Sequence, residues 1–119
     1  MTTLEIVRGD KRDFSITVTQ DGAPLDLTGL VLWFTAKRRH TDPDQAAAFQ
    51  LSSAAGGISI TDAVNGKAEM SIQPGDTSKL PASRTVLVWD LQVVDGSGNP
   101  CTPEWGSLTV IPDVTRRTS

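Results

Sequence analysis

The stretch Arg84–Val94, "RTVLVWDLQVV", is the longest run in the chain with the alternating pattern of a β-strand. One set of alternate positions is wholly apolar, and its members are Leu87, Trp89, Leu91 and Val93. The other set is mixed and includes Asp90 and Gln92. Successive side chains of a strand point to opposite faces of the sheet. We therefore expect a long strand with one face in the protein core.

The same two-residue period recurs on both sides of this strand. It is seen in Asp13–Thr19, Lys67–Ile72 and Cys101–Ile111, and turn residues such as Asn65-Gly66 separate the runs. About seven or eight short strands at a spacing of about 8 to 12 residues, with no long helix, are typical of a sandwich. The sequence thus predicts an all-β fold, an antiparallel Ig-like β-sandwich, with a small barrel as the alternative.

Three segments depart from simple alternation. Leu30–Arg38 is apolar on both faces at its start, which is typical of a central strand covered twice or of a strand that meets a partner. Gln73–Pro81, "QPGDTSKLP", predicts one short helical turn, capped by Asp76 or Thr77, with Leu80 closing the bottom of the core. In Arg38–Phe49, the longest irregular stretch, Pro43 ends any regular structure and one helical turn or a loop follows.

Length and composition narrow the class of protein. The 119 residues fit one domain, which we place at residues 1–112, followed by a polar tail at 113–119. A net charge of −3 argues against a nucleic-acid surface, and no apolar run approaches the roughly 20 residues of a membrane span. The N-terminal residues contain no apolar signal-peptide core, so we expect no export.

The chemistry-bearing residues are few. The lone Cys101 excludes an intrachain disulfide, which suggests a reducing cytoplasm, and with the lone His40 it falls short of a zinc site. A Cys101–His40 catalytic pair is conceivable, but no activating context surrounds the cysteine. Phosphate loops, nucleophile elbows and paired-carboxylate motifs are missing. We expect neither an enzyme nor a cofactor.

Two short motifs each have a functional and a structural interpretation. Arg8-Gly9-Asp10 is an adhesion tripeptide in other contexts, but between two predicted strands the Gly-Asp pair is ordinary turn chemistry. Asp95–Asn99, "DGSGN", alternates oxygen ligands as a calcium loop does, but the distal glutamate of an EF-hand is missing. We predict a turn at the first motif and a hairpin loop at the second.

The remaining candidates are contact residues. We assign Trp89 to the core and place Trp105 at a rim, where tryptophan is enriched in protein interfaces. Basic residues cluster after the strand at Leu30–Arg38 and again in the tail. The predicted protein-contact residues are Trp33, Arg38, Arg39, Trp105, Asp113, Arg116 and Arg117.

Taken in order, the segments resemble a known family. They are "RGDKRDFSITVTQDGAPLDLTG", "LWFTAKR", "GISITD", "NGKAEMSIQPGDTSKLP", "VWDLQVVDGSGN" and "GSLTVIPDVTR". In this order they resemble the Ig-like N-terminal domain of phage baseplate upper proteins and related tail or neck accessory proteins. "PGDTSKLP" is the most telling part, because a generic sandwich does not require a helical turn there. Baseplate upper proteins usually continue into a longer C-terminal portion, whereas this chain ends at Ser119.

The resemblance implies a non-enzymatic structural protein of a phage virion, in the tail, baseplate or neck, assembled in the bacterial host cytoplasm. Its implied partners are other virion proteins and copies of itself, with no nucleic acid and no membrane. The alternative is a carbohydrate or cell-surface binding module of a phage receptor-binding apparatus. That alternative predicts an exposed aromatic platform that includes Trp33 or Trp105.

Overall fold

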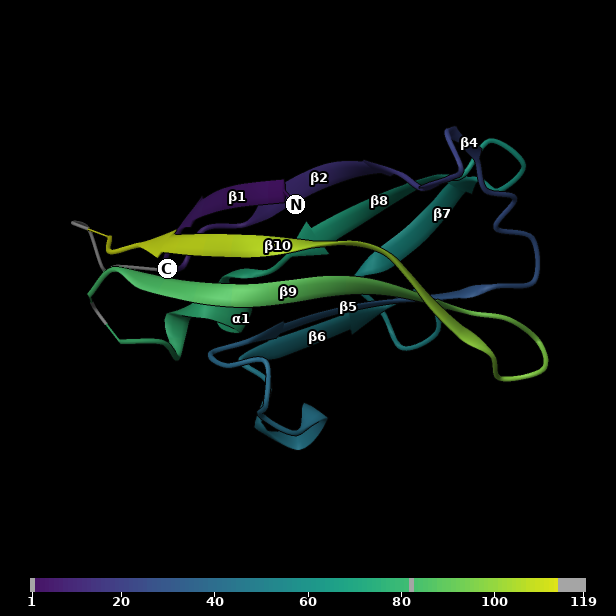
Figure 1. Cartoon of the computed structure of the whole chain (residues 1–119). Coiled ribbons are helices and arrows are strands. Elements are labelled where there is room, and N and C mark those ends of the chain that lie inside the picture. Colours follow the sequence, from purple (N-terminus) through teal and green to yellow (C-terminus); the bar gives the residue numbers. More distant parts are fainter. Residues whose placement is uncertain (1, 82, 114–119) are drawn as a thin grey trace.

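A computed structural model describes residues 2–81 and 83–113, which form two β-sheets packed face to face (Figure 1). The five-stranded sheet contains, in spatial order, β1 (Thr2–Val7), β10 (Pro100–Ile111), β9 (Thr85–Val94), β5 (Val31–Lys37) and β6 (Phe49–Ser52). The three-stranded sheet contains β2 (Arg12–Thr17), β8 (Lys67–Ile72) and β7 (Ile58–Asp62). Two-residue strands β3 (Thr19–Gln20) and β4 (Ala23–Pro24) pair as a small ribbon.

The strand order is that of the immunoglobulin fold. The order β10–β9–β5 opposite β2–β8–β7 matches the G–F–C and B–E–D strands of that sandwich. The pairings are antiparallel except that β1 runs parallel to β10, so the first strand closes one edge of the larger sheet. The predicted all-β Ig-like sandwich is confirmed, and the barrel alternative is wrong because the sheets are separate.

The alternating rows pack between the two sheets. In β9 the row from Leu87 to Val93 is buried, as expected, and in β5 the inward row is Leu32, Phe34 and Ala36. Trp89 is only 6% exposed, its ring centroid lies 5.2 Å from that of Phe34, and its indole N–H donates to the carbonyl oxygen of Ser107. The predicted core position of Trp89 is therefore confirmed.

Gly66 ends the β7–β8 turn in a place that only glycine fits. Its φ is +69°, and its carbonyl oxygen accepts a hydrogen bond from the Val18 N–H. A Cβ atom at this position would lie 2.5 Å from the carbonyl oxygen of Val18. The Asn65-Gly66 pair thus makes the predicted hairpin and also lets the turn pack against the segment after β2.

The two helical segments lie where the alternation fails. The predicted turn is helix α1 (Pro74–Ser78), with Leu80 buried after it, and a 3₁₀ turn, η1, covers Asp44–Ala46. Asp76 takes part in capping the helix, as predicted, since its carboxylate accepts from the Gln73 N–H, although Gln73 and not Asp76 or Thr77 is the N-cap residue. Thr77 is fully buried and accepts a hydrogen bond from the Gly9 N–H.

Candidate functional site

The Arg8-Gly9-Asp10 segment is the turn that follows β1. Gly9 has a φ of +83°, and the Asp10 N–H donates to the carbonyl oxygen of Val7, which closes the turn. The predicted turn is confirmed.

The Arg8 side chain is fully engaged within the domain. Its Nε donates to the carbonyl oxygen of Leu80 at 2.8 Å, and its Nη2 donates to that of Ser78. Its Nη1 lies 3.1 Å from the Asp113 carboxylate, whose side chain is 9% exposed. The Arg8 guanidinium thus links the end of β1 to the segment after α1 and to Asp113 just after β10 by hydrogen bonds and an ion pair. An adhesion motif needs its arginine exposed, so this tripeptide does not serve as one in the folded chain.

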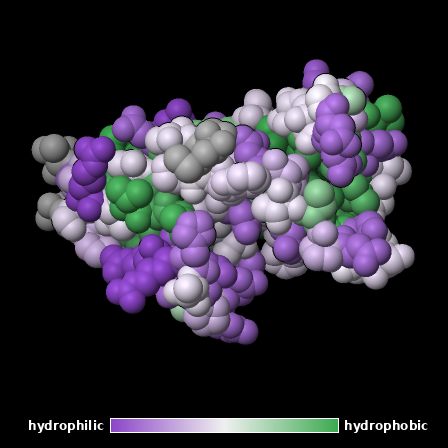
Figure 2. Space-filling view, viewed as in Figure 1, coloured by the Kyte–Doolittle hydropathy of each residue, from purple (hydrophilic) through white to green (hydrophobic). Residues whose placement is uncertain are grey.

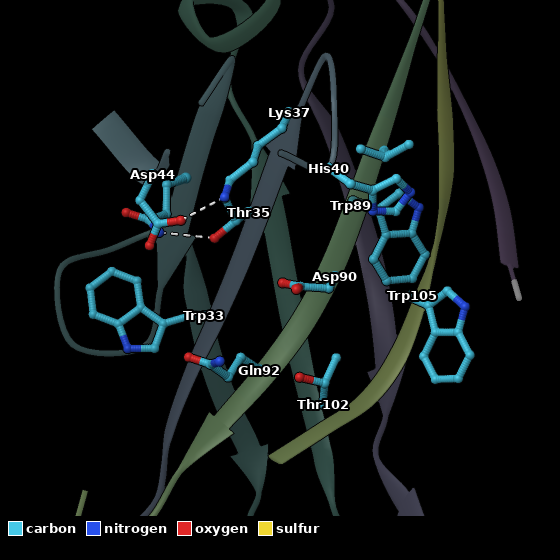
Figure 3. Close-up of a pocket in the computed structure, with 12 residues that line it drawn as sticks. Trp33, Thr35, Lys37, His40, Asp44, Trp89, Asp90, Gln92, Thr102 and Trp105 are labelled. Atoms are coloured by element: carbon cyan, nitrogen blue, oxygen red, sulfur yellow. Dashed lines mark hydrogen bonds and ion pairs between the residues drawn. The ribbon is translucent and has the colours of Figure 1, made fainter. Parts of the chain in front are cut away.

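A hollow of about 450 Å³ lies on the outer face of the five-stranded sheet, which faces away from the second sheet (Figure 3). Many of its lining residues come from three adjacent strands: Trp33, Thr35 and Lys37 on β5, Asp90 and Gln92 on β9, and Trp105 on β10. Figure 2 shows that hydrophobic residues on the side of the molecule seen in Figure 1 form small separate patches between polar ones.

Strand register sets the order of side chains across the hollow. Asp90 pairs with Trp105 on β10 and with Thr35 on β5, and Trp33 pairs with Gln92. Directly paired residues have Cβ atoms about 5 Å apart, and diagonal pairs lie about 7 to 8 Å apart. Asp90 is therefore flanked by Trp105 and has Trp33 as a diagonal neighbour, and Figure 3 shows the two indoles on either side of it.

A β-bulge in β10 places Trp105 on this face. Cys101 pairs with Val93, whereas Glu104 pairs with Leu91, so the register shifts by one residue between Cys101 and Glu104. Without that extra residue Trp105 would lie opposite Trp89, in the buried row. Because side chains alternate with a period of two, a one-residue shift moves Trp105 to the outer face. Trp105 is 52% exposed there.

The charges of the hollow are unequally satisfied. Lys37 Nζ lies 2.8 Å from Asp44 Oδ1 of η1, and Gln50 donates a hydrogen bond to the Thr35 hydroxyl at 2.9 Å. No described residue donates a hydrogen bond to the Asp90 carboxylate. Burial raises the pKa of Asp90, Lys37 counteracts this, and the charge of Asp44 adds to it. The hollow therefore presents a partly desolvated carboxylate between two indoles.

The structure shows where five of the seven predicted contact residues lie. It brings Trp33 and Trp105 to the same hollow. Arg38 and Arg39 are exposed just beyond β5, and the side chain of Asp113 is bonded to Arg8. Arg116 and Arg117, in the predicted tail, lie outside the described residues. A contact role for any of these residues remains a prediction.

Asp90 was not identified from the sequence as a site residue. Its position in the mixed row of Arg84–Val94 indicated an outward carboxylate, but the neighbours Trp105 and Thr35 depend on register across two other strands. The Lys37–Asp44 pair was also missed, since it depends on how η1 folds back beside β5.

The alternative ligand sites are internally satisfied. Asp95 Oδ1 accepts hydrogen bonds from the N–H groups of Ser97 and Asn99, which lowers the pKa of this carboxyl. The predicted hairpin loop between β9 and β10 is thus confirmed, with the carboxylate used for the turn (Figure 1). Within residues 2–81 and 83–113, no three His, Cys, Asp or Glu side chains group as metal ligands, and no helix is long and apolar enough to cross a membrane.

Comparison with known proteins gives a fold and no family. No family model matches the chain, and no curated protein sequence matches it. Among solved structures, the chain is similar to the N-terminal domain of phage TP901-1 ORF48, with a TM-score of 0.54 and 14% identity over 94% of this chain and 86% of that one. A weaker match, with a TM-score of 0.34 and 14% identity over 95% of this chain and 91% of that one, is AggA, the major subunit of aggregative adherence fimbriae type I from Escherichia coli. The first likeness supports the sandwich fold, and the second carries no argument.

Proposed function

We propose that this chain is a non-enzymatic structural component of a phage virion, in the tail, baseplate or neck. It acts by protein–protein contacts made through the outer face of the five-stranded sheet. Two independent observations support the phage assignment. The sequence segments resemble those of phage baseplate and tail accessory proteins, and the fold is similar to a domain of a phage protein.

The observation that carries the contact role is the exposure of Trp105 on the same sheet face as Trp33, across the hollow from it. Trp89, a core tryptophan, is 6% exposed and its indole N–H donates a hydrogen bond within the fold. Trp105, by contrast, is 52% exposed. Tryptophans are enriched among the residues that carry binding energy in protein interfaces. Two of them on one sheet face, around a hollow with polar groups at its floor, match an interface core with hydrogen-bonding partners.

The assignment is tested on particles of the phage or prophage that carries the gene. Purified, density-banded particles are digested, and peptides of this chain are quantified by mass spectrometry against those of the major capsid protein. We expect a fixed ratio that survives nuclease treatment and high-salt washing. Absence of the chain from particles, or a ratio that falls to background after washing, would overturn the assignment.

A second candidate is a carbohydrate or cell-surface binding module. The observation that favours it is the same pair of indoles beside Gln92 and Thr102, since sugars bind to aromatic faces flanked by hydrogen-bonding groups. Intrinsic tryptophan fluorescence is titrated with host surface polysaccharide. A saturable change that Trp105→Ala abolishes would support this candidate, and an unchanged spectrum would dismiss it.

A further inference from the structure

The outer-face hollow holds a carboxylate that the described part of the chain leaves without a hydrogen-bond donor. Asp90 lies on β9, the middle strand of the larger sheet, and its pKa is raised by burial. The charge of Lys37, in the same hollow, acts on Asp90, but Lys37 Nζ lies 2.8 Å from the Asp44 carboxylate and is paired with it. With that pair neutral, Asp90 leaves the hollow with a net negative charge whenever His40 is uncharged.

The aromatic side chains around Asp90 favour a cationic ligand, as the Asp90 carboxylate does. Trp33 and Trp105 stand on either side of Asp90 (Figure 3). The negative face of an indole ring attracts a cation, and a guanidinium can stack on the ring while it donates to a carboxylate. Glycans would also stack on the indoles and could donate hydroxyl hydrogen bonds to the carboxylate, but a guanidinium donates from a positively charged group and so gains more from a desolvated carboxylate.

We infer that this hollow receives a cationic side chain, arginine above all, presented by a different protein chain of the assembly. The carboxylate of Asp90 accepts hydrogen bonds from the guanidinium, and the rings of Trp33 and Trp105 enclose it. Charge complementarity selects this occupant. The inference rests on the proposed function, because it names the chemistry of the contact that the proposed function requires.

The other features of the molecule are less informative. The Arg8 guanidinium is fully used inside the fold, and the Asp95 carboxylate is used by its own loop. A smaller opening, bordered by Leu4, Phe14 and Ile16, is lined mainly by apolar side chains, and the Glu104 side chain at its edge already interacts within the described part of the chain.

The test uses the isolated, ¹⁵N-labelled chain and two probes of nearly the same shape, one cationic and one neutral. N-acetyl-arginine amide is titrated at neutral pH and low ionic strength, and its neutral analogue N-acetyl-citrulline amide is the comparison. The indole N–H resonances of Trp33 and Trp105 report on the hollow, and the backbone amide resonance of Glu69, on β8 of the other sheet, serves as an internal reference. We expect the arginine probe to shift the two reporters at least threefold more than the citrulline probe.

Variants separate this site from general charge attraction. Asp90→Asn should reduce the arginine response at least threefold, and Trp105→Ala should do the same. Glu69→Gln, which removes an exposed carboxylate from β8 of the other sheet, should leave the response unchanged. Equal responses to the two probes, or a response that survives Asp90→Asn, would overturn the inference.

Two further results would also overturn it by naming another occupant. Larger indole shifts with N-acetylglucosamine than with the arginine probe would assign the hollow to carbohydrate. Dimerisation of the free chain in sedimentation equilibrium, abolished by Asp90→Asn, would assign it to a second copy. Because these measurements use the isolated chain, their outcome is independent of whether the chain is found in particles.

Discussion

Arg8 and Asp113, which stand 105 residues apart in sequence, form an ion pair with 3.1 Å between Nη1 and Oδ1. The same guanidinium donates to two backbone carbonyl oxygens, at Ser78 and Leu80. Three distant segments of the chain therefore meet at one side chain: the turn after β1, the segment that follows α1, and the end of β10. The Arg8-Gly9-Asp10 tripeptide therefore has a structural role: its arginine links three segments at one end of the sandwich.

Loss of the Arg8 hydrogen bonds and ion pair should destabilise the fold. Arg8→Ala removes three hydrogen bonds and leaves half-buried carbonyl groups and a carboxylate with fewer donors. We expect the free energy of unfolding to fall by about 2 to 3 kcal/mol, measured by urea denaturation. Arg84→Ala, at an exposed position, is the matched control and should change it by less than about 0.5 kcal/mol. Equal effects of the two substitutions would contradict the role given to Arg8.

The tight turn at Gly66 predicts a second stability difference. Alanine at Gly66 combines a strained φ of +69° with a Cβ placed 2.5 Å from the Val18 carbonyl oxygen. Gly98 also has a positive φ, +81°, but has open space around the added atom. Gly98→Ala should cost about 1 kcal/mol from backbone strain alone. Gly66→Ala should cost about 2 to 4 kcal/mol, since the clash is with backbone. Thermal unfolding that shows the same loss for both would refute the packing argument.

Truncation of Trp89 and of Trp105 should reduce stability to very different extents. Trp89→Ala empties a core position and should reduce the free energy of unfolding by about 3 to 5 kcal/mol. Trp105→Ala should change it by about 0.5 kcal/mol or less, because the side chain is 52% exposed. Calorimetry on both variants gives the comparison. A large loss of stability in Trp105→Ala would mean that this residue serves the fold and not a partner.

Asp90 and Asp95 should give stability differences of opposite sign with pH. The pKa of Asp90 is raised by burial from its ordinary value of 3.8, so its ionised form opposes folding as pH rises through the raised pKa. Asp90→Asn should therefore be more stable than the parent at neutral pH, and the gain should vanish below about pH 3.8. Lys37, Asp44 and His40 face the same hollow and are kept unchanged in the comparison.

For Asp95 the signs reverse. Hydrogen bonds from the Asn99 and Ser97 N–H groups lower its pKa below 3.8, so its ionised form stabilises the fold above that value. Asp95→Asn should be less stable than the parent at neutral pH, and the loss should diminish as pH falls through the lowered pKa. Urea titrations of both variants from pH 3 to pH 7 provide the test. Two curves of the same sign would contradict the electrostatic assignment.

The fold could be predicted from the sequence because the alternation of apolar and polar residues along a strand is a local property. The apolar row of Arg84–Val94 alone indicates which side chains face the core, and the glycine and asparagine of Asn65-Gly66 indicate where the chain reverses. The helical turn at α1 was predicted for the same reason, since proline, aspartate and threonine lie close together. Each of these predictions needs only neighbours in sequence.

The residues of the outer-face hollow could be predicted only in part from the sequence. Trp33 and Trp105 were predicted as contact residues, but Asp90 was not grouped with them. That grouping depends on the bulge between Cys101 and Glu104, which shifts the β10 register by one residue. The structural role of Arg8 was not predicted, because its hydrogen-bond partners lie 70, 72 and 105 residues away in sequence. Long-range register and long-range ion pairs leave no pattern in a single sequence.

The central claim is that the outer face of the five-stranded sheet makes the contacts by which this chain joins its assembly. The most direct measurement is the occupancy of variant chains in phage particles produced without the wild-type copy. The Trp33→Ala/Trp105→Ala double variant tests this face, and Ser15→Ala/Glu69→Ala, on exposed positions of the three-stranded sheet, is the matched control. We predict that the double tryptophan variant folds but is incorporated at less than about a tenth of the control level. Full incorporation of the tryptophan variant, or loss of the control variant, would contradict the claim.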